Sequence, residues 1–162
     1  MAATVSLIEY LGSATTTATA TVLDLGSTLA SNLDEDTYPV STGNYSYSKC
    51  FKLSFGGSFT TVTNVILYKS AGDYVTGEII NFGVSSAYHV PTGGSYQDSI
   101  ATDAIATSLP STTNITVGGT ITYTLNATEN TTDYIYLQAS LTTQATAQDA
   151  NQKTLTVTYS ET

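Results

Sequence analysis

The chain has 162 residues, which is enough for one domain with a sizeable core, and 41% of them are hydrophobic. Thirteen acidic residues are accompanied by only four lysines and no arginine, so the net charge is −9. Because nucleic-acid binding draws most of its affinity from Lys and Arg contacts to phosphates, this balance argues against DNA, RNA and anionic membranes as partners.

The residue types favour β-structure. The chain contains 32 Thr, 18 Ser and 12 Tyr, and β-branched and aromatic side chains fit the pleated surface of a sheet. Cys50 is the only cysteine, which rules out a disulfide within the chain. No basic region precedes an apolar run at the start, and no stretch approaches the roughly 20 apolar residues of a membrane span. We therefore expect an all-β protein made without a signal peptide.

Residues 1–42 differ in composition from the rest. An apolar patch at residues 5–11 is followed by an Ala/Thr-rich run at residues 13–22, which alternates like a strand but has little to bury. These features predict an extended arm or edge strand beside a sandwich domain at residues 43–162. We expect the sandwich to fold without residues 1–12. The arm would contact a neighbouring subunit through Leu7, Ile8, Tyr10 and Leu11.

Strand periodicity becomes clear in the middle of the chain. Residues 45–55 alternate between apolar and polar side chains, interrupted by Lys49 on the apolar side and Cys50 on the polar side. Residues 62–69 and 77–84 predict two further strands. A Pro-Thr-Gly-Gly sequence then marks a loop.

The second half of the chain begins less regularly. Residues 97–106 predict a short helix, bounded by Pro110. Residues 120–125 alternate as a strand does, and residues 133–141 are apolar on both faces, which is typical of a central strand. Alternation at residues 154–159 predicts the last strand.

About seven short strands separated by turn signals predict an antiparallel β-sandwich, immunoglobulin-like in topology, with a jelly roll as the alternative. The residues expected inside it are Phe51, Leu53, Phe55, Ile121, Leu155 and Val157.

Candidates for catalysis are weak. His89 is the only histidine, and Ser85, Ser86 and Asp98 lie near it in the sequence. The run around Ser85 lacks the final glycine of a nucleophile elbow, so a loop histidine is a better interpretation than a catalytic triad. One His and one Cys do not provide the ligands of a typical zinc site.

Acidic residues give no stronger candidate. Asp34, Glu35 and Asp36 lack the spacing and the glycine of an EF-hand calcium loop and predict a solvated turn. Asp73 and Glu78 are not placed across a cleft by any pattern, as a glycosidase would require. We therefore expect a protein that is not an enzyme, with no catalytic residue, metal site or cofactor.

Four Asn-x-Ser/Thr sequons are weak evidence for glycosylation: Asn44, Asn114, Asn126 and Asn130.

The loop near Pro91 supplies the remaining candidates for contacts with a partner, which are Tyr88, His89 and Tyr96. Sugar sites on β-sandwiches stack aromatic rings on the ligand, and these tyrosines offer such rings in a chain without Trp. A packing role is the better interpretation for each of them.

Several runs of the sequence carry a likeness to a known family. They are Thr-Tyr-Pro-Val at residues 37–40, Gly-Asn-Tyr-Ser-Tyr-Ser-Lys at 43–49, Phe-Lys-Leu-Ser-Phe at 51–55, Asp-Tyr-Ile-Tyr-Leu-Gln at 133–138 and the closing strand at 154–161. Together they resemble small immunoglobulin-like virion proteins of tailed bacteriophages, of the capsid decoration or cement type.

The resemblance covers residues 37–161 and implies a structural function. It implies a protein that binds the outside of a phage shell and stabilises it, with the major capsid protein or other virion proteins as partners. It further implies a homo-oligomer or lattice-bound state on the capsid exterior, after synthesis in the host cytoplasm. The alternatives are a tail, neck or fibre component of the virion, or a surface adhesin or carbohydrate-binding module.

Overall fold

The computed structural model shows an all-β protein, without a helix in the part of the chain that it describes. That part comprises residues 3–13, 17–34, 36–93, 101, 103–115, 121–122, 130–145 and 152–162. The strands are β1 (Thr4–Tyr10), β2 (Thr17–Ala20), β3 (Lys49–Gly56), β4 (Thr61–Ala71), β5 (Glu78–Ser85), β6 (Asp103–Ala104), β7 (Ile121–Thr122), β8 (Tyr134–Leu141) and β9 (Thr154–Glu161).

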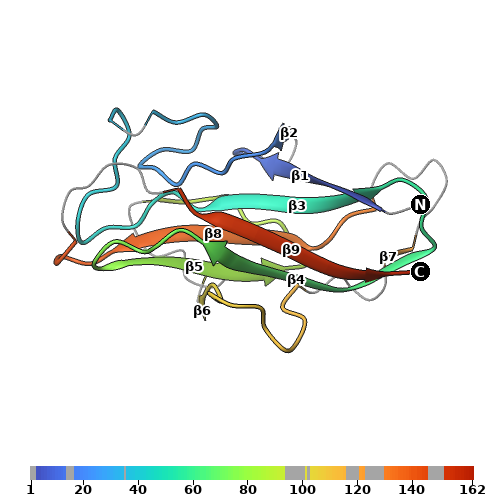
Figure 1. The fold of residues 1–162 in the computed structure, drawn as a ribbon. Helices are drawn as coiled ribbons and strands as arrows, with labels where there is room; N and C mark the ends of the chain where they lie inside the picture. The colour runs from blue at the N-terminus through green and yellow to red at the C-terminus, as the bar shows by residue number, and fades with distance from the viewer. Residues whose placement is uncertain are drawn as a thin grey trace.

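The strands form two antiparallel sheets (Figure 1). The larger sheet has the order β2-β1-β3-β8-β5-β6, and the smaller sheet has the order β7-β4-β9. Apolar faces of the two sheets enclose the main core, as in a β-sandwich. The antiparallel two-sheet arrangement expected from the strand pattern is confirmed, whereas an immunoglobulin-like topology stays a prediction.

The strand nearest the N-terminus, β1, lies inside the larger sheet. It pairs with β3 from Thr4 opposite Gly56 to Tyr10 opposite Cys50, and it pairs with β2 on its other side. The expected extended arm is therefore not confirmed for these residues. β1 already obtains its backbone hydrogen bonds within its own chain, and β2 is the strand at the edge.

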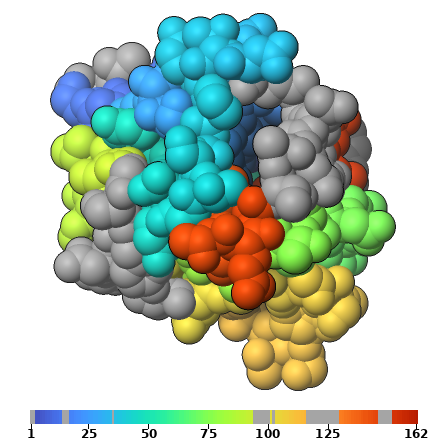
Figure 2. Space-filling view, turned by 90° about the vertical axis from the view of Figure 1, so that its left-hand side faces the viewer, coloured from blue at the N-terminus to red at the C-terminus, as the bar shows by residue number. Residues whose placement is uncertain are grey.

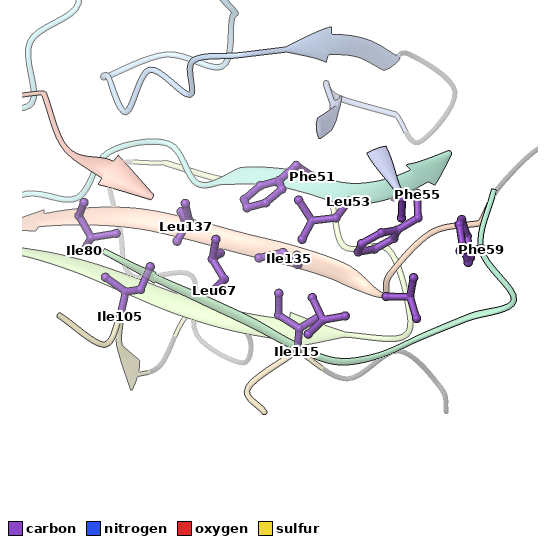
Figure 3. Packing of buried hydrophobic residues seen from close by; sticks show 13 residues of the cluster. Phe51, Leu53, Phe55, Phe59, Leu67, Ile80, Ile105, Ile115, Ile135 and Leu137 are labelled. Atoms are coloured by element: carbon purple, nitrogen blue, oxygen red, sulfur yellow. The ribbon is translucent and has the colours of Figure 1, made fainter. Parts of the chain in front are cut away.

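The main core lies between the two sheets. Phe51, Leu53 and Phe55 project into it from β3, where the structure buries them among side chains of β4, β5 and β8 (Figure 3). The predicted burial of these three residues is confirmed. Leu155 and Val157 of β9 pack against the same core and remain half-buried.

The two interruptions in the alternation of β3 have separate explanations. Lys49 shares the parity of Phe51 and is buried at the end of the core, where it pairs with Glu9. Cys50 points to the opposite face and is buried there in a second cluster. β3 is therefore covered on both faces, which alternation alone did not predict.

Two expectations concern segments that the structure describes only in part. The helix predicted at residues 97–106 is wrong at Asp103–Ala104, which form β6 beside β5. Residues 97–100 and 102 lie outside the described part. β7 is the described part of the strand expected at residues 120–125, and the side chain of Ile121 lies outside the description.

The loops around Asn44, Gly77 and Thr142 pack together at one end of the sandwich (Figure 2). The Leu141 N–H donates to the carbonyl of Asn44 (3.0 Å), and the Thr142 N–H donates to the carbonyl of Gly77 (2.8 Å). Gly77 has a φ of 79°, and a Cβ there would come within 2.3 Å of the Thr142 hydroxyl oxygen. The close approach and the left-handed backbone both require glycine at this position.

Candidate interaction surface

The outward face of the larger sheet carries the second buried cluster. Cys50 lies between Tyr10 of β1 and Tyr136 of β8, directly opposite both in the strand register. Successive residues of a strand point to opposite faces, so these three side chains point away from the main core. We call this surface the tyrosine face, formed by Ile8, Tyr10, Cys50, Lys52, Tyr88, Tyr134 and Tyr136.

The rings of the tyrosine face contact one another. Tyr10 meets Tyr134 edge to face at 5.2 Å between ring centroids, and Tyr88 lies 6.0 Å from Tyr10 and 5.4 Å from Tyr134. The Lys52 ammonium lies 4.1 Å from the Tyr134 ring centroid, a cation–π contact. Such ring pairs stabilise packing beyond the area they bury, so the cluster is a defined surface.

The loop at residues 86–93 is tied to this face by hydrogen bonds. The Tyr88 hydroxyl donates to the carbonyl of Gly12, just after β1. The His89 N–H donates to the hydroxyl oxygen of Tyr136 (2.7 Å). The same Tyr136 hydroxyl donates its proton to the carbonyl of His89 (3.3 Å). The end of β1 and the loop therefore belong to one continuous surface.

The structure brings together two groups of residues that the sequence placed about 80 positions apart. The predicted interaction residues that meet at the tyrosine face are Ile8, Tyr10, Tyr88 and His89. Leu7 does not join them, because it points to the opposite side of β1 and packs against the main core. Leu11 is half-buried after the end of β1, and Tyr96 lies outside the described residues.

The sequence-based prediction missed Lys52, Tyr134 and Tyr136. A signal for the two tyrosines was present, because residues 134–137 are apolar on both faces of the strand. A strand that is apolar on both faces needs a cover on each, which here is the main core on one side and the tyrosine face on the other. Nothing in the local pattern linked Lys52 to a tyrosine ring.

Three groups of the tyrosine face, the Cys50 thiol and the hydroxyls of Tyr88 and Tyr136, stay protonated at neutral pH. Burial raises the pKa of the Cys50 thiol to about 12 and the pKa of the Tyr88 hydroxyl to about 12. Burial also raises the pKa of Tyr136 well above its ordinary range. A protonated buried thiol is a poor nucleophile, so Cys50 has a packing role in this face.

These raised pKa values predict that alkaline conditions destabilise the fold. Between the pKa of an unfolded thiol, about 8.5, and the folded value of about 12, the native state keeps a proton that the unfolded state loses. The free energy of unfolding should therefore fall by about 1.4 kcal/mol per pH unit in that window from Cys50 alone. Urea titrations at pH 8 to 10 measure this slope. The Cys50→Ala variant should lose that slope, and an equal slope in both proteins would contradict the assignment.

Each of the four lysines is held by a neighbouring group. Lys49 forms a buried ion pair with Glu9 (2.9 Å), and Lys153 forms one with Glu78 (2.6 Å). Lys69 donates a hydrogen bond to the carbonyl of Gly72. Lys52 lies over the ring of Tyr134. Carboxylates such as Asp36 and Asp103 are exposed.

Two acidic candidates have structural roles. Asp34 accepts hydrogen bonds from the N–H and the hydroxyl of Thr37 (2.8 Å each), and these bonds lower the pKa of its carboxyl. Glu78 binds Lys153 and accepts a hydrogen bond from the Val75 N–H (3.0 Å). Glu78 is therefore part of an ion pair that joins β5 to the start of β9.

Asn114, one of the sequon asparagines, has a structural role as well. Its amide nitrogen donates to the carbonyl of Leu67 (2.7 Å), and its oxygen accepts from the N–H of Leu67 (2.9 Å). The side chain thus pairs with β4 as a neighbouring strand would, and a glycan on this nitrogen would disrupt that pairing.

Within the described ranges, no group of three or more His, Cys, Asp and Glu side chains is placed to hold a metal ion. In the same part of the chain, no helix is long and apolar enough to span a membrane. Comparisons of the chain with protein-family models, curated proteins and solved structures find no match.

Proposed function

We propose that this chain is a non-enzymatic structural protein of a virion, a decoration or cement protein that binds the outside of a phage shell and stabilises it. The observation that carries the proposal is the tyrosine face, where the half-buried side chains of Ile8, Tyr88 and Tyr134 pack against a buried layer of Tyr10, Cys50 and Tyr136. Aromatic residues are enriched at the centres of protein interfaces, because they bury much area at little cost in conformational entropy.

The charge distribution supports the exterior location. All four lysines are held by neighbours, while several carboxylates are exposed. A protein that faces a packaged genome needs exposed cations for phosphate contacts, and a protein on the outside of a shell does not. The proposed partner is therefore the major capsid protein or another virion protein.

The proposal predicts that changes to the tyrosine face release the protein from shells. Tyr88→Ala and Lys52→Glu should each weaken binding by at least about tenfold, the effect of losing a contact at an interface centre. Purified protein is added to particles that lack their native copy, and occupancy is measured by cryo-electron microscopy. The matched control is Tyr68→Ala on the outward side of β4, in the other sheet.

Thermal melting of each variant separates loss of binding from loss of folding. If folded Tyr88→Ala and Lys52→Glu keep wild-type occupancy, the tyrosine face is not the attachment surface. Binding of the wild-type protein to tails or glycans, and not to shells, would replace the proposal with an alternative.

A further inference from the structure

The end strands of the two sheets differ greatly in length. In the described part of the chain, β2 spans four residues and β6 and β7 span two each, whereas β9 spans eight. Natural sheets limit unwanted pairing by keeping edge strands short or by placing charges and prolines on them. Between Thr154 and Ser160, β9 contains no charged residue, no Pro and no Gly. β9 therefore has the features of an edge that accepts another strand.

The hydrogen bonds of β4 show which backbone groups of β9 point outward. Leu67 directs its N–H and its carbonyl to Asn114, on the side of β4 away from β9. Residues directly opposite in an antiparallel pair point their backbone groups either both toward each other or both away. Val157 lies opposite Leu67, so its backbone groups point away from β4. By alternation, the same holds for Leu155 and Tyr159.

The larger sheet extends beyond β9 on the side away from β4, where no described residue forms a further strand. Tyr159 packs edge to face against Phe55 of β3 (5.2 Å), so β1 and β2 continue past the last strand of the smaller sheet. On the inward face of β1, Val5 lies opposite Phe55 and is 38% exposed, and Leu7 is half-buried. Leu23 and Leu25, which follow β2, pack against an adjoining part of the core without forming a strand. A strand added to β9 would lie against Val5 and Leu7.

We infer that the edge of β9 accepts an extended segment of a neighbouring polypeptide as an additional antiparallel strand. The segment would hydrogen-bond to Leu155, Val157 and Tyr159 and place small apolar side chains, at alternate positions, against Val5 and Leu7. Pairing of β9 with β9 of a second copy is less suitable. A two-fold axis between the strands would bring the overhanging β1 and β2 of both copies together. The inference does not rest on the tyrosine face, which lies on the opposite side of the larger sheet.

The whole chain with an appended strand tests this inference without knowledge of the partner. Thr162 pairs with Thr61 of β4, so one further residue is needed before the turn. A Thr-Asn-Gly sequence followed by a nine-residue strand of alternating Val and Thr is fused after Thr162, so that it folds back antiparallel to β9 and reaches Leu155. Amide hydrogen exchange at Leu155, Val157 and Tyr159 should slow by at least about tenfold, because exposed amides gain partners. The matched control is a tail of equal length with Pro at the positions that face β9, which removes the donors.

Two substitutions test the apolar floor of the site. Val5→Lys should abolish the slowing of exchange, while Ile79→Lys should leave it unchanged; Ile79 has similar exposure, 42%, on the outward side of β5. Unchanged exchange with the appended strand would overturn the inference. Equal slowing with the proline control would overturn it as well.

Discussion

Lys49→Met is expected to lower the free energy of unfolding by about 3–5 kcal/mol. Lys49 is fully buried and donates to a carboxylate oxygen of Glu9 (2.9 Å) and to the carbonyl of Ala30. Glu9 is 1% exposed, so the substitution leaves its carboxylate in the core without a counter-ion. The hydrogen bond that it accepts from the Ser31 hydroxyl does not replace the lost positive charge. Chemical denaturation of the variant beside the wild type measures the loss.

The matched control removes both charges. Lys49→Met combined with Glu9→Leu should recover most of the lost stability, because apolar replacement of a whole buried ion pair is often neutral or stabilising. If the double variant is as unstable as the single one, the unpaired charge is not the cause of the loss. The loop at Ala30 and Ser31 would then be the element that Lys49 mainly supports.

Deletion of residues 1–12 is expected to abolish cooperative unfolding of the chain. The deletion removes β1 from the interior of the larger sheet and takes with it the pairing partner of β2 and the counter-ion of Lys49. Tyr10 is buried and Leu7 is half-buried, so their packing contributes at most about 3 kcal/mol each, and the orphaned lysine costs about 3–5 kcal/mol. Together these losses approach the roughly 5–15 kcal/mol that stabilises a typical domain.

Calorimetry of the truncated chain tests this expectation against the one based on sequence alone, in which the sandwich folds without residues 1–12. Removal of residues 1–2 is the control, since it keeps Ala3, whose carbonyl accepts a hydrogen bond from the Tyr159 hydroxyl (3.0 Å). A truncated chain that also carries Lys49→Met separates the strand from the ion pair. A cooperative transition near the wild-type temperature would show that β1 is a dispensable arm.

Local periodicity was sufficient for the fold class and part of the core. Alternation around Phe51, Leu53 and Phe55 reports which side chains share a face of a strand, and hydrophobic burial then fixes that face inward. The same pattern cannot identify the neighbouring strand, because pairing is decided by contacts between distant parts of the chain. This is why residues 1–42 were separated from the sandwich although β1 lies beside β3.

The candidate surface followed the same division. Sequence alone selected Leu7, Ile8, Tyr10 and Leu11 from an apolar patch, and Tyr88, His89 and Tyr96 from a loop near proline. Of these contact residues, Ile8, Tyr10, Tyr88 and His89 meet at the tyrosine face. Only the tertiary structure brought them onto one face, since the register of β1, β3 and β8 places Tyr10, Cys50 and Tyr136 side by side. Lys49 shows the limit most clearly. In the sequence, Lys49 was a charge at an apolar position of the alternation. Its burial is explained only by Glu9, which lies forty positions away in the chain and accepts a hydrogen bond from the Lys49 ammonium at 2.9 Å.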